Sequence, residues 1–226
     1  MVAPDVSAML YRGVREQVTT TARTLDDEQL ATTVPGCPRW TVHDLLAHQA
    51  GFAPDFVENH LDGAPPDAWT AVHVDTRRDR PVGDLMDEWD EYGEQLEQIV
   101  RAGQRPGRLL NNPYVEAGTH CADLNAVVPV GRPDREVWLA ALDFCLRHDK
   151  GDEPGVLHLL TEDAGYRVGH GDDLAAEVTV DSYELFRAAF GRRSAAQIEG
   201  WAWRGDATPW SHRLARLPLT TTDQKD

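Results

Sequence analysis

The sequence predicts an α+β protein with a helical bundle over residues 1–150 and a small α/β domain over residues 155–222. Apolar residues recur every three or four positions through the first part, as in amphipathic helices. Short β-type runs separated by turn residues follow it. Between the two, Lys150-Gly151-Asp152-Glu153-Pro154 has the composition of a linker. The chain of 226 residues is long enough for such a pair of domains.

The first two helices are predicted by periodicity and by a start signal. One apolar stripe predicts a helix through Ala8, Tyr11, Val14, Val18, Ala22 and Leu25. A second helix should run from about Thr41 to about His60, because Thr41 and Asp44 have the spacing of a capping box. Its inner face would carry Leu45, His48, Phe52 and Phe56.

The rest of the bundle alternates breaks and helices. Residues 63–80 are polar and rich in proline and aspartate, and we expect a long surface loop there. A third helix begins at Pro81, and its acidic side is expected to be a solvated face: Asp87, Glu88, Asp90, Glu91, Glu94 and Glu97. Residues 103–113 read as a break before a fourth helix at about 114–127. A fifth helix is predicted from Pro133 to about His148.

The C-terminal part should contain short strands and helices. Strands are predicted over Val156–Leu160, Tyr166–Val168, Ala175–Val180 and Ile198–Trp203. Asp181 is placed to cap a helix that ends at Gly191, and Trp210–Leu217 would form a last helix.

Composition and charge exclude several classes of function. The net charge of −16 disfavours binding to nucleic acid. No apolar run approaches the roughly 20 residues of a membrane span, and the start of the chain lacks the pattern of a signal peptide. We therefore expect a cytoplasmic protein that is a monomer or small homo-oligomer. Its three cysteines, Cys37, Cys121 and Cys145, are interpreted as structural rather than as a disulfide framework.

One helix carries a pattern typical of metal sites. Glu116, His120 and Asp123 share a face of the predicted fourth helix. His48, on the inner face of another helix, is a possible third ligand, and two histidines with one carboxylate give zinc a three-ligand site with an open position. The alternatives are a surface Glu–His contact and a hydrogen-bonded core histidine, because periodicity alone does not show that the two helices face each other.

Two stretches resemble a known family. The segment Val34–Gly51, with its Cys-Pro-Arg-Trp-Thr and its terminal His48-Gln-Ala-Gly, resembles a signature of the mycothiol-dependent maleylpyruvate isomerase family, within the DinB-like group of metal-binding four-helix bundles. The segment Glu116–Leu124 resembles its second signature, Glu-x-x-x-His-x-x-Asp-Leu. Asp181–Arg193 is similar to the family's small C-terminal domain, so the resemblance extends over nearly the whole chain.

The resemblance implies a site and a chemistry. It implies that His48, Glu116 and His120 bind a divalent ion, most simply zinc, and that mycothiol, a thiol of actinobacteria, is the cosubstrate. A metal-activated thiolate would attack a small electrophile, giving an isomerase or an S-transferase. Asp123 is predicted to fix a histidine tautomer. Arg192 and Arg193 are predicted to hold a substrate carboxylate, with a helix C-terminal role as the alternative.

Two other functions stay open from the sequence. A metal-dependent hydrolase on the same bundle would use water in place of the thiol. A non-catalytic metal-binding module would use the ion only to hold helices together.

Overall fold

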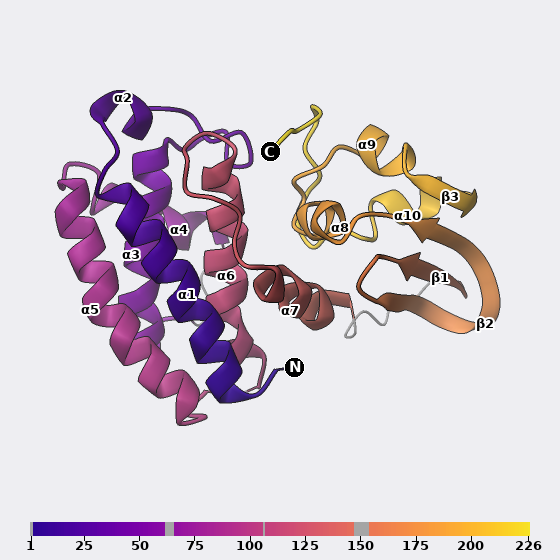
Figure 1. Cartoon of the computed structure of the whole chain (residues 1–226), viewed down its shortest axis with the longest axis horizontal. Helices are drawn as coiled ribbons and strands as arrows, with labels where there is room; N and C mark the ends of the chain where they lie inside the picture. The colour runs from indigo at the N-terminus through magenta and orange to yellow at the C-terminus, as the bar shows by residue number, and fades with distance from the viewer. Residues whose placement is uncertain (1, 62–65, 106, 147–153) are drawn as a thin grey trace. The chain divides into compact units, whose positions relative to one another are not determined.

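The computed structural model describes residues 2–61, 66–105, 107–146 and 154–226, and the chain divides into two compact units (Figure 1). The helical unit comprises Val2–Val137 and the C-terminal unit comprises Trp138–Lys225. The division falls inside α7 (Arg135–Leu146). The domain limits 1–150 and 155–222 stay a prediction, since most of the linker lies outside the described residues. Within the described ranges, no helix combines the length and apolar character of a membrane span.

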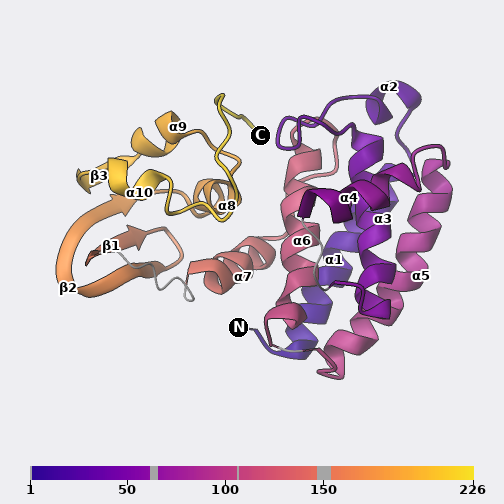
Figure 2. The same ribbon diagram turned by 180° about the vertical axis from the view of Figure 1, so that it is seen from behind.

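The helical unit is a four-helix bundle, as the sequence predicts. Its helices are α1 (Pro4–Ala22), α3 (Val42–Glu58), α5 (Val82–Arg101) and α6 (Gly107–Asn125). Each of α1 and α3 packs against both α5 and α6 (Figures 1 and 2). The predicted inner face of α3 is buried, with exposed fractions of at most 3% at Leu45, His48, Phe52 and Phe56. Apolar burial of this kind is the main stabilising contribution to such a bundle.

The loop before α3 is fixed at both ends. α2 (Asp27–Leu30) precedes it, and an isolated bridge joins Thr33 to Thr41. The predicted capping box is present: Asp44 N donates to Thr41 Oγ1 at 3.1 Å, and Thr41 N donates to Asp44 Oδ2 at 3.0 Å. The loop 34–40 therefore has one defined path over the start of α3.

Two predicted breaks are wrong. Residues 66–75 of the expected loop form α4 (Pro66–Asp75), while residues 62–65 lie outside the described residues. Proline is tolerated at the first helical position, and α4 buries His73 and Val74 against the bundle rather than a periodic stripe. Likewise α6 begins at Gly107, with Pro113 inside it, so the expected break over 103–113 is shorter than predicted.

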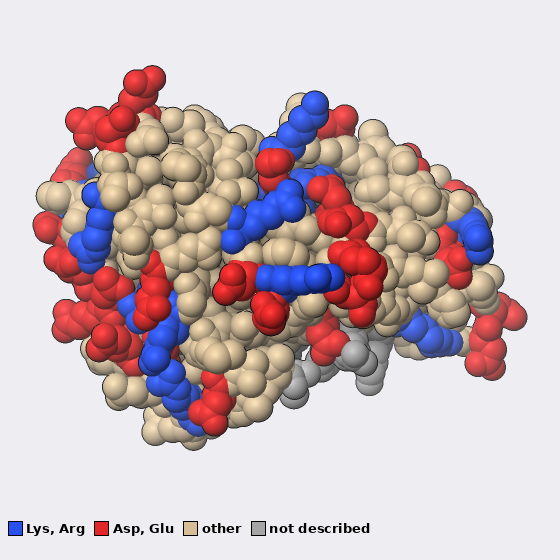
Figure 3. Space-filling model, in the orientation of Figure 1, with Lys and Arg blue, Asp and Glu red and all other residues tan. Residues whose placement is uncertain are grey.

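The acidic side of α5 is only partly solvated. Acidic side chains, with arginines among them, line the side of the helical unit that α5 forms (Figure 3). Asp87, Glu91 and Glu94 are exposed as expected. Glu97 is 1% exposed and accepts hydrogen bonds from Arg12 Nε at 2.7 Å and Arg15 Nη2 at 3.0 Å. The prediction is wrong for Glu97, because these arginines make its burial possible.

The C-terminal unit contains a three-stranded antiparallel sheet in the order β1-β2-β3. Its strands are β1 (Pro154–Leu160), β2 (Gly165–Thr179) and β3 (Ala202–Gly205), and its short helices are α8 (Ser182–Ala189), α9 (Ala195–Glu199) and α10 (Thr208–Ser211). Asp181 caps α8 as predicted, accepting from Tyr183 N at 2.9 Å. The two strands predicted between 166 and 180 are one long strand, β2. Of the predicted last strand, Ile198 and Glu199 belong to α9 instead.

Candidate metal centre

The three predicted metal ligands lie together in the helical unit. His48 comes from α3, and Glu116 and His120 come from consecutive turns of α6. Glu116 Oε1 is 2.8 Å from His48 Nε2 and 3.2 Å from His120 Nε2. One ligand atom from each residue lies within 4.8 Å of the others, the spacing that a shared metal ion requires. The face-to-face arrangement of the two helices, which periodicity left open, is therefore present.

Burial and hydrogen bonding set the charges of this group. Burial raises the pKa of Glu116, but its contacts with His120 and His48 outweigh that effect and hold the pKa well below its usual range. Burial lowers the pKa of His48, which favours the neutral imidazole. Glu116 and His48 are thus in the protonation states of metal ligands.

His120 is held from both sides. Burial lowers its pKa, but contacts with Asp123, Cys37 and Glu116 outweigh this and raise the pKa well above the usual histidine value. Its Nδ1 lies 3.0 Å from Asp123 Oδ2, and the Asp123 side chain is 0% exposed. A buried carboxylate behind Nδ1 keeps a proton there, so the proton at Nε2, which faces Glu116, is the one that a bound cation would replace. Asp123 therefore lies where its predicted orienting role requires.

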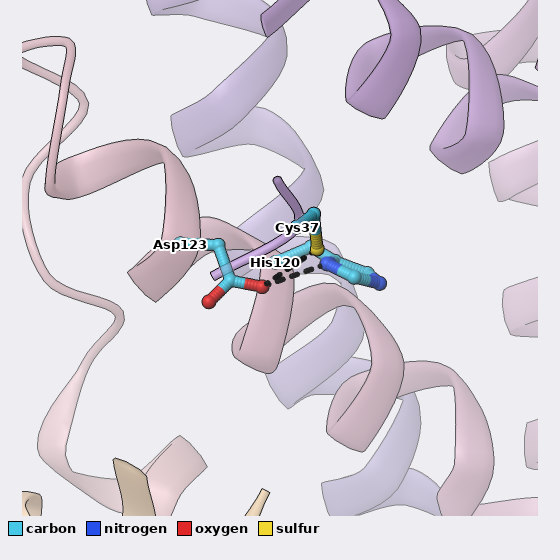
Figure 4. A group of neighbouring side chains, drawn as sticks. All are labelled: Cys37, His120 and Asp123. Carbon is cyan, nitrogen blue, oxygen red and sulfur yellow. Dashed lines mark hydrogen bonds and ion pairs between the residues drawn. The ribbon is translucent and has the colours of Figure 1, made fainter. Parts of the chain in front are cut away.

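Cys37 joins this group from the loop before α3. Its Sγ is 3.7 Å from Asp123 Oδ2, and Figure 4 shows Cys37, His120 and Asp123 pointing toward one another. The sequence interpretation of Cys37 as a turn residue missed this contact, because residues 86 positions apart share no sequence pattern. The three residues form a second group whose donor atoms lie within 4.8 Å. Cys121 and Cys145 are buried and belong to neither group.

Two tryptophans flank the centre. The Trp40 ring centroid lies 5.0 Å from that of His48 and 6.2 Å from that of His120. Trp69 of α4 meets His48 edge-on at 6.3 Å. Both indoles are half-buried, so they give the ligands apolar walls that limit access of water.

Comparison with known proteins identifies the family. A family model described as the mycothiol maleylpyruvate isomerase N-terminal domain matches residues 11–125, just over half of the 226 residues. The chain belongs to this family. The matched region spans the bundle and contains His48, Glu116 and His120, and its members are named for an enzyme. The chain is therefore a member of an enzyme family.

Solved structures of the mycothiol-dependent maleylpyruvate isomerase share the fold. A crystal structure of that isomerase has 16% sequence identity, covers 84% of this chain and 90% of its own, and superposes with a TM-score of 0.58. A histidine-to-alanine mutant of the isomerase has 12% identity with the same coverage and TM-score. No curated protein matches the sequence. The structural likeness extends beyond the N-terminal domain of the mycothiol maleylpyruvate isomerase family to most of the chain.

Sequence reasoning missed two residues behind His48 in this family member. His73 Nδ1 of α4 lies 3.0 Å from His48 Nδ1, and His73 Nε2 lies 2.9 Å from Asp55 Oδ2. Burial lowers the pKa of His73. The available signal was Trp69 and His73 at i, i+4 spacing, which was hidden because the segment was interpreted as a loop.

The two predicted substrate-binding arginines lie in the C-terminal unit and are buried. Arg193 makes a bidentate ion pair with Glu184, with N–O distances of 2.7 and 2.8 Å. Arg192 Nη1 donates to the Phe190 carbonyl at 2.7 Å. The Arg192 contact fits the alternative role at the end of α8, whereas Arg193 pairs with a residue in the first turn of that helix. Substrate binding by Arg192 and Arg193 stays a prediction.

Proposed function

We propose that this chain is a metal-dependent, mycothiol-dependent isomerase of the maleylpyruvate type, or an S-transferase on the same scaffold that acts on a small electrophile. Membership of the mycothiol maleylpyruvate isomerase family supports the thiol and the reaction class. The observation that supports a metal ion at this site is the convergence of two imidazole Nε2 atoms on one oxygen of Glu116, at 2.8 and 3.2 Å.

The residues fit a zinc ion. Two imidazole nitrogens and one carboxylate oxygen are the ligands of catalytic zinc sites that keep a fourth position for substrate. The side chain of Glu116 is 29% exposed, so a small thiol has a route to the ion. In the second group Asp123 is 0% exposed, and its Oδ2 already contacts both Cys37 Sγ and His120 Nδ1. We therefore assign the metal to His48, Glu116 and His120.

Each residue of the chain has a distinct task in this proposal. A bound divalent cation supplies Lewis acidity that lowers the pKa of a coordinated thiol. His48, Glu116 and His120 hold that cation at one point of the bundle. Asp123 holds the proton at His120 Nδ1, and Trp40 limits water beside the ligands. Arg192 and Arg193 are proposed to bind a carboxylate of the substrate, as guanidinium groups do bidentately.

We place the activity in the cytoplasm, with a small electrophile and a low-molecular-weight thiol as partners. The net charge of −16 supports small molecules over nucleic acid. The chain is proposed to act as a monomer or small homo-oligomer.

An activity assay with paired omissions tests the proposal. Protein purified without metal-affinity resin is given maleylpyruvate with mycothiol, and isomerisation is followed by absorbance; a fluorogenic alkyl halide replaces maleylpyruvate to detect S-transfer. We expect turnover in at least one of the two assays. Removing either zinc or mycothiol should abolish that turnover. Glu116→Gln should do the same, while His212→Gln, an exposed histidine of the C-terminal unit, should not. Turnover of the alkyl halide that persists without the thiol, with water displacing the halide, would instead support the hydrolase. Turnover that persists without metal would overturn the metal assignment.

A further inference from the structure

We infer that Asp55 and His73 are positioning residues that fix the tautomer of His48, so that its Nε2 lone pair faces the metal position. This inference rests on the metal site proposed above. The contacts run in one line behind the ligand: Asp55 Oδ2 to His73 Nε2 at 2.9 Å, then His73 Nδ1 to His48 Nδ1 at 3.0 Å. His73 is 2% exposed and His48 is 1% exposed, so water does not replace these contacts.

Trp69 sets the direction of the hydrogen bonds. Its indole Nε1 is 2.6 Å from Asp55 Oδ2, and an indole N–H only donates. Asp55 Oδ2 is therefore an acceptor, and the same oxygen faces His73 Nε2. His73 Nε2 carries the proton, which leaves His73 Nδ1 as an acceptor when the ring is neutral. His48 Nδ1 must then be the donor.

Counting protons supports a cation at the far end. The line from Asp55 to Glu116 has three contacts, at 2.9, 3.0 and 2.8 Å, but two neutral imidazoles supply only two N–H protons. With the first two contacts occupied by protons, an imidazole lone pair faces a carboxylate oxygen at the third. A cation there satisfies both acceptors, and His120 Nε2 faces the same oxygen.

Packing places His73 close enough to act. A Cβ atom on Gly51 of α3 would lie 2.7 Å from His73 Cβ and 2.7 Å from its Cγ, so only glycine permits this approach of α4. The arrangement behind His48 resembles the one behind His120, where Asp123 contacts Nδ1 directly. Each ligand histidine thus has a carboxylate behind it, direct for His120 and through His73 for His48. Partners of this kind orient metal-binding imidazoles.

The test compares two replacements of His73 and reads the tautomer directly. His73→Asn keeps an acceptor oxygen near the position of Nδ1, whereas His73→Leu removes it. Zinc affinity is measured by competition with a chromophoric chelator. The tautomer of His48 is read by ¹⁵N NMR in histidine-labelled wild-type protein, with His48→Gln used to assign the signal. This readout uses wild-type protein, so it does not depend on whether a His73 variant folds.

The inference predicts a proton on His48 Nδ1 in the wild type. His73→Leu should bind zinc about 10–100-fold more weakly than the wild type, and His73→Asn should recover most of that loss. A proton on His48 Nε2 in the zinc-free wild type, or equal zinc affinity in His73→Leu and the wild type, would overturn the inference. Neither result would exclude zinc binding by His48, Glu116 and His120, because zinc can displace that proton. Wild-type protein that binds no zinc would overturn the proposed function itself, and with it any metal-directed role of Asp55 and His73.

Discussion

Gly51→Ala is the substitution that most sharply probes the docking of α4. Gly51 lies inside α3, where alanine is favoured over glycine by about 1 kcal/mol in an exposed helix. The added methyl group, however, would lie 2.7 Å from two atoms of His73, and contacts of that length force a neighbour to move. Overpacking of a core typically costs about 1–3 kcal/mol. We therefore expect Gly51→Ala to change the free energy of unfolding by between about 0 and 2 kcal/mol, in the destabilising direction.

Gly13→Ala is the matched control. Gly13 is an exposed glycine inside α1, and a Cβ atom there meets nothing within 4 Å. It should gain the helix-propensity term of about 1 kcal/mol without the clash. The difference between the two variants, about 1–3 kcal/mol, isolates the cost of moving His73.

Urea unfolding followed by helical circular dichroism measures both variants, and chelator competition measures their zinc affinity. Gly51→Ala should bind zinc more weakly than Gly13→Ala, because His73 no longer supports His48. If both variants gained the same stability and bound zinc equally, the contact between α4 and Gly51 would not exist in solution.

Three further substitutions probe other contacts. Glu88→Gln should lower the free energy of unfolding by about 1–2 kcal/mol at pH 7, because it removes charge-assisted hydrogen bonds to two arginines. These arginines outweigh the effect of burial and lower the pKa of Glu88, so its stabilisation is present above the unfolded-state pKa and is lost as the pH falls through the folded one. The free energies of unfolding of the wild type and Glu88→Gln should therefore approach each other as the pH falls below about 4. A difference that stays constant over that range would contradict the assignment. Asp123→Asn should weaken zinc binding by about 10–100-fold in the chelator assay, because the carboxylate behind His120 is lost; unchanged affinity would remove Asp123 from the site. Arg193→Lys should lower the melting temperature through loss of a bidentate ion pair. A rise in KM for the substrate in that variant is the additional effect expected if Arg193 also binds a carboxylate.

The bundle could be predicted from sequence because its helices carry strong local signals. The inner face of α3 and its capping box each lie within one segment, so periodicity and a start motif suffice. The N-cap of α8 at Asp181 was predictable for the same reason. Breaks were less predictable, because proline marks both the ends and the first turns of helices. Pro66 begins α4 and Pro113 lies within α6, where sequence reasoning expected loops.

The candidate site was predictable only in part, because some of its residues come from segments that are far apart in the sequence. Glu116 and His120 are one turn apart on a single helix, and this four-residue spacing can be recognised from the sequence alone. The residues behind the ligands come from other segments: Cys37 from a loop, Asp55 from the far end of α3, and His73 from a helix that tertiary contacts stabilise. Buried polar contacts between distant segments have no periodicity, and they emerge only when the helices are packed.

The position of a bound metal distinguishes the two groups of candidate ligands. Crystals of protein purified without metal-affinity resin and supplied with zinc are measured at the zinc absorption edge, and an anomalous difference map locates the ion. We predict one peak at about 2.0–2.2 Å from His48 Nε2, a carboxylate oxygen of Glu116 and His120 Nε2. The absence of a peak there, or a peak between Cys37 Sγ, His120 Nδ1 and Asp123, would contradict this prediction.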